Sequence, residues 1–215
     1  KFHEKNGAKL IQVNDTTQNF EYKVVWIMKI INFFFILFCT LIFLPYSGAM
    51  AYEEANYDIV VKNEIYEIRK YSNRLAIETI ENDQNSGFRK LFKYISGNNQ
   101  SNQKIKMTTP VTRVKKNGNM TMQFYLPSEF NEKNIPDPND ENVNIVMIEG
   151  GYYAAIIYSG RTTDKNFLKY TNVLEKELVK DNILIESLPI RATYNSPFTL
   201  PMNRRNESMF KINYK

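Results

Sequence analysis

Apolar and polar positions alternate along most of this 215-residue chain after residue 57, a pattern typical of half-buried β-strands. The clearest case is Met120–Leu126, in which every second residue is Met, Phe or Leu and the residues between are Thr, Gln and Tyr. Asn117-Gly118 stands just before this segment and favours a tight hairpin turn. Val111–Lys116 is therefore predicted as the partner strand.

The same alternation predicts strands elsewhere in the chain. Near the start, Glu64–Tyr71 and Arg74–Ile80 flank Ser72-Asn73, and we predict that they form a first hairpin. Further strands are predicted at Val143–Met147, Tyr152–Tyr158, Ile190–Tyr194 and Met209–Tyr214.

Two segments change to the spacing of amphipathic helices. The first is Ser86–Ile95, with Asn85 or Ser86 as the capping residue and Gly97 as the stop signal. Its apolar residues recur at i, i+3, i+4 and i+7, at positions Phe88, Leu91, Phe92 and Ile95. This spacing predicts a helix whose apolar stripe packs against a sheet.

The second helix is predicted at Asp164–Lys180. Thr162 or Thr163 can cap its first turn, and Asp181-Asn182 ends it. Its apolar stripe consists of Phe167, Tyr170, Leu174 and Leu178. Each half of the chain therefore holds one helix among strands. This order predicts an α+β domain with an antiparallel sheet and pseudo-duplicated halves of βαβ type.

The N-terminal part has a different character. Ile30–Leu44 is an apolar run of 15 residues, shorter than the roughly 20 that span a bilayer but typical of a signal peptide. Lys29 precedes the run, and Ala49-Met50-Ala51 offers small residues for cleavage. We interpret residues 28–51 as a signal peptide cleaved after Ala51, and residues 1–27, which lack Met, as an upstream extension foreign to the native protein. The alternative is an uncleaved signal anchor at residues 30–44.

Cleavage would change the composition. It removes five of the 28 Lys and Arg residues and three of the 23 Asp and Glu residues, so residues 52–215 carry a net charge of only +3. This balance gives no support to nucleic-acid binding. The only His and the only Cys, His3 and Cys39, are also lost. We therefore predict no enzyme with a Cys–His pair or a Ser–His–Asp triad, and no metal site that uses histidine.

Two proline-containing segments do not fit a strand or a helix. They are Lys104–Val111, with Met107-Thr-Thr-Pro-Val111, and Asn195–Glu207, with Arg204-Arg-Asn-Glu207. Such segments specify backbone shape, because each proline fixes its own φ and restricts its neighbour. A cluster like Arg204–Glu207 is structural when its guanidinium groups bond loop carbonyls or pair with Glu207.

These segments resemble the signature of the SOUL/haem-binding protein family, Met-Thr-x-Pro-Val followed by Tyr-x-x-Pro and Arg-Arg-Asn-Glu. The resemblance covers Tyr57–Asn213 and extends to four more segments, Tyr66–Tyr71, Phe88–Gly97, Phe124–Pro127 and Pro136–Pro138. It implies a distorted antiparallel β-barrel with two helices, a fold shared with effector-binding domains of bacterial regulators. It also implies binding of haem or another tetrapyrrole.

The resemblance implies a site on the first helix and in the C-terminal loop. Arg89 and Lys93 lie one helical turn apart, with Asn85 one turn earlier, and Lys93 matches a position implicated in contacting haem propionates. Phe198 could cover a flat ligand from the loop. The alternative for Arg89 and Lys93 is the solvated side of an amphipathic helix. The alternative for Met107 is that its side chain packs in the core and does not ligate iron. After cleavage, any iron ligand would be Met, Tyr, Lys or water.

We therefore predict an exported binding protein, periplasmic or secreted, that holds a hydrophobic anionic small molecule non-covalently and without histidine ligation. It is expected to be a monomer without enzymatic activity or nucleic-acid partners, and to contact a membrane only if the signal segment stays uncleaved. The alternative function is a cofactor-free envelope module that binds a protein or a lipid.

Overall fold

The computed structural model describes residues 25–36, 52–81, 84–116 and 118–215. The chain divides into two units, Lys1–Met50 and Ala51–Lys215, which we describe separately. In the first unit a helix runs over residues 25–36, and among the described helices none is long and apolar enough to cross a membrane. Most of the upstream extension and the predicted cleavage position after Ala51 lie outside the described residues, so the signal peptide stays a prediction.

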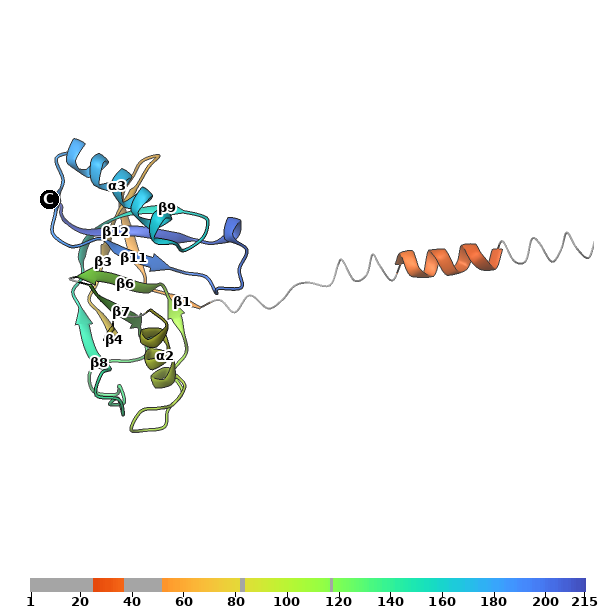
Figure 1. Ribbon diagram of the computed structural model, residues 1–215, viewed down its shortest axis with the longest axis horizontal. Helices are drawn as coiled ribbons and strands as arrows, with labels where there is room; N and C mark the ends of the chain where they lie inside the picture. Colours follow the sequence, from red (N-terminus) through yellow and green to blue (C-terminus); the bar gives the residue numbers. More distant parts are fainter. Residues whose placement is uncertain (1–24, 37–51, 82–83, 117) are drawn as a thin grey trace, which may run out of the picture. The chain divides into compact units, whose positions relative to one another are not determined.

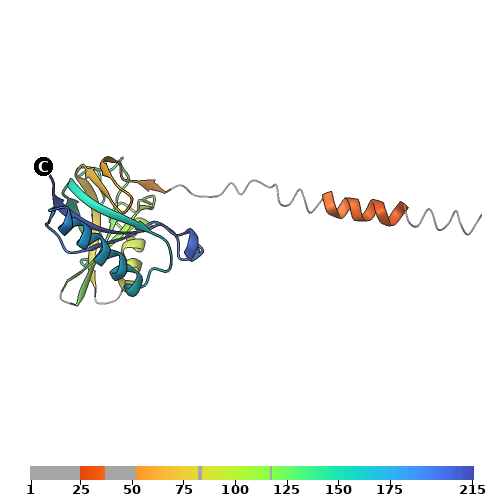
Figure 2. The same cartoon turned by 90° about the horizontal axis from the view of Figure 1, so that it is seen from above.

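The second unit is built on one curled antiparallel sheet that forms an open half-barrel (Figures 1 and 2). Its strands follow one another across the sheet as β2 (Tyr57–Lys62), β3 (Glu67–Tyr71), β9 (Gly151–Tyr158), β12 (Asn206–Asn213), β11 (Ile190–Thr193), β6 (Val111–Lys116), β7 (Asn119–Tyr125), β4 (Arg74–Glu81) and β8 (Asn144–Ile148). A short strand, β10 (Leu184–Ile185), adds to β12. Separately, β1 (Glu53–Glu54) pairs in parallel with β5 (Thr108–Thr109).

The two halves of the sheet repeat one arrangement. In the first half, β4 is followed by α2 (Gln84–Ile95), β6 and β7; in the second, β9 is followed by α3 (Asp164–Lys180), β11 and β12. The halves meet where β6 pairs with β11 (Figure 1). Helix α2 packs on β4 and β7, while α3 packs on β9 and β12. The α+β class and the pseudo-duplicated halves predicted from the sequence are confirmed.

The predicted first hairpin is wrong. The strands β3 and β4 follow each other in the chain, but β3 pairs with β2 and β9, whereas β4 pairs with β7 and β8. The reason is that β3 belongs to the second half, where it lies next to β9, just as β8 lies next to β4 in the first half. The chain therefore crosses from the second half to the first at Ser72-Asn73. This crossing touches the β8–β9 connection, where a Cβ on Gly150 would lie 2.4 Å from the Tyr71 carbonyl oxygen.

The other predicted strands are confirmed, and so is the pairing of β6 with β7, in which Lys116 lies opposite Asn119. The predicted turn includes residue 117, which lies outside the described residues. Helix α2 differs in its packing from the predicted stripe. Leu91 and Ile95 are buried, but Phe88 and Phe92 remain 42% and 49% exposed, and Tyr94 is buried in their place. The buried face of α2 is therefore rotated, which leaves the two phenylalanine rings at its edge.

Helix α3 begins and ends as predicted. Thr163 is its N-cap, and its hydroxyl oxygen accepts a hydrogen bond from the Asn166 amide at 3.2 Å. Its buried residues are Phe167, Thr171, Leu174 and Leu178.

We expect Thr163→Ala to lower the free energy of unfolding by about 1 kcal/mol, because the alanine leaves the Asn166 amide without its capping acceptor. Urea denaturation of the wild type and the variant measures this difference. Thr163→Ser keeps the hydroxyl and is the matched control. Equal losses in both variants would show that the capping bond does not stabilise the helix.

Candidate functional site

A cavity of about 440 Å³ lies between α2, the central strands and the C-terminal loop. Its volume falls within the range of about 300–1,000 Å³ that is usual for small-molecule sites. The lining residues come from α2, from the segment around β5 and β6, and from the loop that follows β11: Tyr52, Asn85, Phe88, Phe92, Met107, Thr109, Val111, Arg113, Met122, Thr162, Thr193, Tyr194, Asn195, Ser196, Pro197 and Arg204.

One wall of the cavity is aromatic and apolar. The rings of Phe88 and Phe92 are stacked, with centroids 5.9 Å apart and an interplanar angle of 12°. Phe88 also packs edge-on against the buried ring of Phe124 at 5.2 Å. The side chains of Met107 and Val111 continue this wall. Such a surface suits the flat face of a conjugated ligand, since aromatic rings favour offset stacking.

Arg113 on β6 is the exceptional polar residue of the lining. Its side chain is buried, with the residue only 6% exposed, and Nε and Nη1 have no hydrogen-bond partner among the described residues. Burial, together with the neighbouring charge of Arg191, lowers the pKa of Arg113 to about 10. The guanidinium is therefore still protonated at neutral pH.

The C-terminal wall is shaped by arginine. Arg204 donates from Nε to the Thr199 carbonyl at 2.7 Å and from Nη2 to the Pro197 carbonyl at 2.6 Å. The Arg205 backbone amide donates to Asn195 Oδ1 at 2.6 Å. These bonds fold the loop back on itself before the short helix η1 (Pro201–Asn203). The structural role predicted for the Arg204–Glu207 segment is confirmed.

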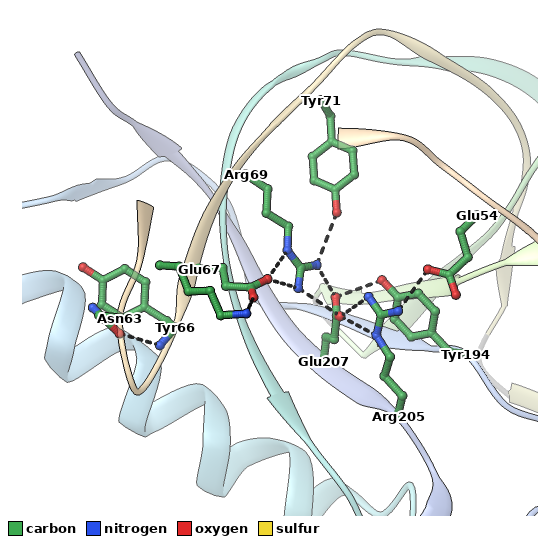
Figure 3. A network of polar contacts seen from close by, with 10 residues as sticks. Glu54, Asn63, Tyr66, Glu67, Arg69, Tyr71, Tyr194, Arg205 and Glu207 are labelled. Carbon is green, nitrogen blue, oxygen red and sulfur yellow. Dashed lines mark hydrogen bonds and ion pairs between the residues drawn. The ribbon is translucent and has the colours of Figure 1, made fainter. Parts of the chain in front are cut away.

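Figure 3 shows a buried ion-pair network that includes Tyr194 of the cavity lining. Arg69 pairs with Glu67 at 2.7 Å and with Glu207 at 2.8 Å, and Arg205 also pairs with Glu207 at 2.8 Å. Tyr194, which lines the cavity, donates its hydroxyl to Glu207 at 2.9 Å. Burial and the negative charge of Glu207 raise the pKa of Tyr194 well above its ordinary value. The network therefore holds Tyr194 neutral and fixed in the cavity wall.

Comparison with known proteins decides the family. The sequence profile of the family described as "SOUL heme-binding protein" matches residues 52–211. The chain belongs to the SOUL heme-binding protein family. Mouse heme-binding protein 2 is 31% identical to this SOUL protein in an alignment of 162 residues that covers 66% of this chain and 75% of the mouse protein. The family resemblance seen in the sequence motifs is thus confirmed.

Solved structures with the same fold are more distant. The C-terminal domain of EcmrR superposes with a TM-score of 0.51 at 14% identity, covering 73% of this chain and 98% of that domain. A hydrolase from Listeria innocua superposes with a TM-score of 0.52 at 9% identity, covering 72% of this chain and 94% of that protein. At such low identity the likeness concerns the fold alone.

The site residues predicted for this SOUL protein lie in different places. Asn85 lines the cavity, although it lies within α2 rather than at its cap. Arg89 and Lys93 are exposed on α2 outside the cavity lining. Phe198 follows Pro197 in the loop and is 94% exposed, so its ring points away from the protein's packed interior.

Sequence reasoning missed Arg113, Phe88 and Phe92 as site residues. A signal for Arg113 was present, because on a strand it shares a face with Val111, which is apolar and buried. An arginine at an inward position of a strand needs a partner or a function.

The described residues offer a limited set of side chains that could hold haem iron. They contain neither His nor Cys, and they hold no cluster of three acidic residues that could bind a metal. Met107 packs against the first core cluster, as its predicted structural role requires, but it also lines the cavity beside the tyrosines Tyr52 and Tyr194. These residue types can ligate haem iron.

We expect Arg204→Ala to release the C-terminal loop while leaving the fold intact, because the two carbonyls that it bonds lie in one exposed loop. Amide exchange at Thr199 and Asn203, whose backbone amides donate within the loop, should accelerate about 10-fold. Mass-spectrometric hydrogen exchange measures this change. Unchanged exchange in this segment would show that Arg204 does not order the loop.

Proposed function

We propose that this SOUL protein binds haem or another tetrapyrrole non-covalently in the cavity beside α2, without histidine ligation. One observation carries the proposal: the cavity joins a stacked aromatic wall to a buried, unpaired guanidinium, which is the combination that a flat, apolar and anionic molecule requires. The membership of this chain in a family described as heme-binding supports the same ligand.

The apolar wall would supply most of the affinity. Phe88 and Phe92 still expose about half of their surface, and a bound macrocycle would cover it together with Met107. Covering apolar surface contributes ~25 cal/mol per Å², so a few hundred Å² yields several kcal/mol. The iron of haem would supply redox and ligand-binding chemistry, and Met107 and Tyr52 are the lining side chains of a type that could hold it, since the Tyr194 hydroxyl is already bound to Glu207.

The exposed residues would act at the rim. Arg89 and Lys93 present two positive charges near the α2 wall and would attract an anionic ligand as it enters, while Asn85 would offer a hydrogen bond inside. Phe198, which is nearly fully exposed beside the lining residue Pro197, would cover the ligand after binding.

The remaining features of the proposal concern the cellular setting. We propose that residues 28–51 are a signal peptide and that residues 52–215 act outside the cytoplasm as a monomeric binding protein, with no enzymatic activity and no nucleic-acid partner. The heme-binding family and the mild net charge of residues 52–215 support this role.

A second candidate is a cofactor-free module that binds a protein or a lipid. The observation in its favour is the exposed apolar tip of the C-terminal loop, where Phe198, Leu200 and Met202 are all largely exposed. Such a tip is a usual feature of interaction surfaces. It is the better explanation if the cavity takes no small molecule.

Titration of hemin into the protein, followed by absorbance in the Soret region, tests the proposal. We expect a saturable shift of the band at one equivalent. The double charge reversal Arg89→Glu with Lys93→Glu should weaken binding a few-fold, because solvent screens both exposed charges. Absence of a saturable change would reject haem binding.

A further inference from the structure

Three arginines are buried in the part of the chain that the structure describes, and two of them have acidic partners. Arg69 is paired with Glu67 and Glu207, and Arg191 donates to Asp164 Oδ1 at 2.7 Å. Arg113 differs, because its Nε and Nη1 are buried without any partner among the described residues. Proteins rarely leave a buried charge unpaired, because an uncompensated ion in the interior is strongly destabilising.

The residues around Arg113 add positive charge and do not supply the acidic partner that its side chain lacks. On β11, Arg191 lies directly opposite Arg113 in the strand register, so two guanidinium groups share one face of the sheet. The carboxylate whose charge acts on Arg113 is Asp164, and it is already bound to Arg191. Two positive charges therefore share one negative charge, so the described residues around Arg113 do not neutralise its guanidinium.

The position of Arg113 shows where a neutralising anion would come from. Arg113 lines the cavity, and its neighbour Met122 on β7 does so too. The stacked rings of Phe88 and Phe92 form the apolar part of the same lining. A molecule that fills this cavity and brings an anion to Arg113 would therefore place its apolar body against these rings.

We propose that Arg113 binds the acidic group of the cavity's ligand, and that the site selects flat apolar molecules that carry a carboxylate. This inference rests on the proposed function and specifies its ligand class. The planar guanidinium matches a carboxylate through two parallel hydrogen bonds. A haem would then place one propionate inward against Arg113 rather than only at the rim against Arg89 and Lys93.

The experiment compares hemin with its dimethyl ester, which keeps the macrocycle and removes both negative charges. Wild-type protein should bind hemin about 10- to 100-fold more tightly than the ester, since hydrogen bonds to charged groups are worth that much in affinity. Arg113→Met should remove most of this preference and leave affinity for the ester unchanged or improved. Equal affinity of the wild type for both compounds, or a preference that survives in Arg113→Met, would overturn the proposal.

Arg161→Met is the matched control, because it removes an exposed guanidinium that lies next to the lining residue Thr162 in the chain but does not itself line the cavity. It should keep the preference for hemin over the ester. If it loses the preference as fully as Arg113→Met does, the effect comes from general positive charge and the proposal is wrong.

Thermal unfolding separates a binding role from a structural one. Without ligand, Arg113→Met should be at least as stable as the wild type, because methionine fills similar space without an unpaired charge. Should this variant fail to fold, Arg113→Lys keeps the charge with fewer donors and should show a reduced preference. An undiminished preference in Arg113→Lys would then count against the bidentate contact.

A probe unrelated to haem distinguishes failure of this inference from failure of the proposed function. Anilinonaphthalene sulfonate is an anionic aromatic fluorophore, and N-phenylnaphthylamine is its neutral counterpart. If hemin does not bind but the protein prefers the anionic fluorophore, and Arg113→Met abolishes that preference, haem is the wrong ligand and Arg113 is still the anion site. If hemin binds with no contribution from Arg113, the proposed function is supported and the anion-binding role of Arg113 is contradicted.

Discussion

Replacing Arg69 with methionine is expected to lower the free energy of unfolding by about 3–5 kcal/mol, because it removes one partner of a fully buried ion pair. The Arg69 side chain is 0% exposed and bonds two carboxylates from different strands, Glu67 on β3 and Glu207 on β12 (Figure 3). Without Arg69, Glu67 and Glu207 lose a shared buried cation. Urea denaturation measures the loss, and the midpoint of thermal unfolding should fall by about 10 °C.

Lys180→Met is the control for this prediction. Lys180 also forms an ion pair, with Glu177 at 3.0 Å, but its side chain is 72% exposed, and surface pairs of this kind contribute little. We expect no measurable change in stability for Lys180→Met. If Arg69→Met is as stable as this control, the network does not stabilise the connection between β3 and β12 across the intervening strand β9.

The second large effect concerns the aromatic wall. The double substitution Phe88→Ser with Phe92→Ser is expected to weaken hemin binding by about 30- to 100-fold, or roughly 2–3 kcal/mol, because it removes two rings that a bound macrocycle would cover. Both side chains are already about half exposed, so the fold should survive the change. Soret titration measures the affinity, and circular dichroism checks the fold.

Leu168→Ser with Val179→Ser is the matched control. These residues lie on α3, are 52% and 67% exposed, and do not line the cavity. Their loss should leave hemin affinity unchanged. Equal weakening by both double variants would mean that hemin adsorbs to exposed apolar surface rather than entering the cavity.

Much of the architecture could be predicted from local patterns. The alternation in Met120–Leu126 and the capping signal before Asp164–Lys180 are local properties of the chain, and both elements form where they were expected. The pseudo-duplication of the two halves could be predicted because the sequence pattern of each half indicates one helix among strands. Six short motifs predicted the family for the same reason, since each is contained in a limited run of consecutive residues.

The features that were missed depend on residues far apart in the chain. Nothing near Ser72-Asn73 indicates that β3 pairs with β9, which begins about 80 residues later, so the local pattern predicts a hairpin instead. The apolar stripe of α2 contained Phe88 and Phe92, but helical spacing does not show which apolar residues a neighbouring strand covers. Arg113 is unpaired only because Arg191, from the other half, takes the nearby Asp164.

The location of the ligand is the central claim, and amide chemical shifts measured during a hemin titration of isotope-labelled protein test it most directly. We expect saturable shifts or paramagnetic broadening for residues 85–93 of α2, for 107–113, and for the loop at 193–204, with little change around β10 and the end of α3. Saturable changes centred on β10 and the end of α3, or no saturable change at all, would contradict the account.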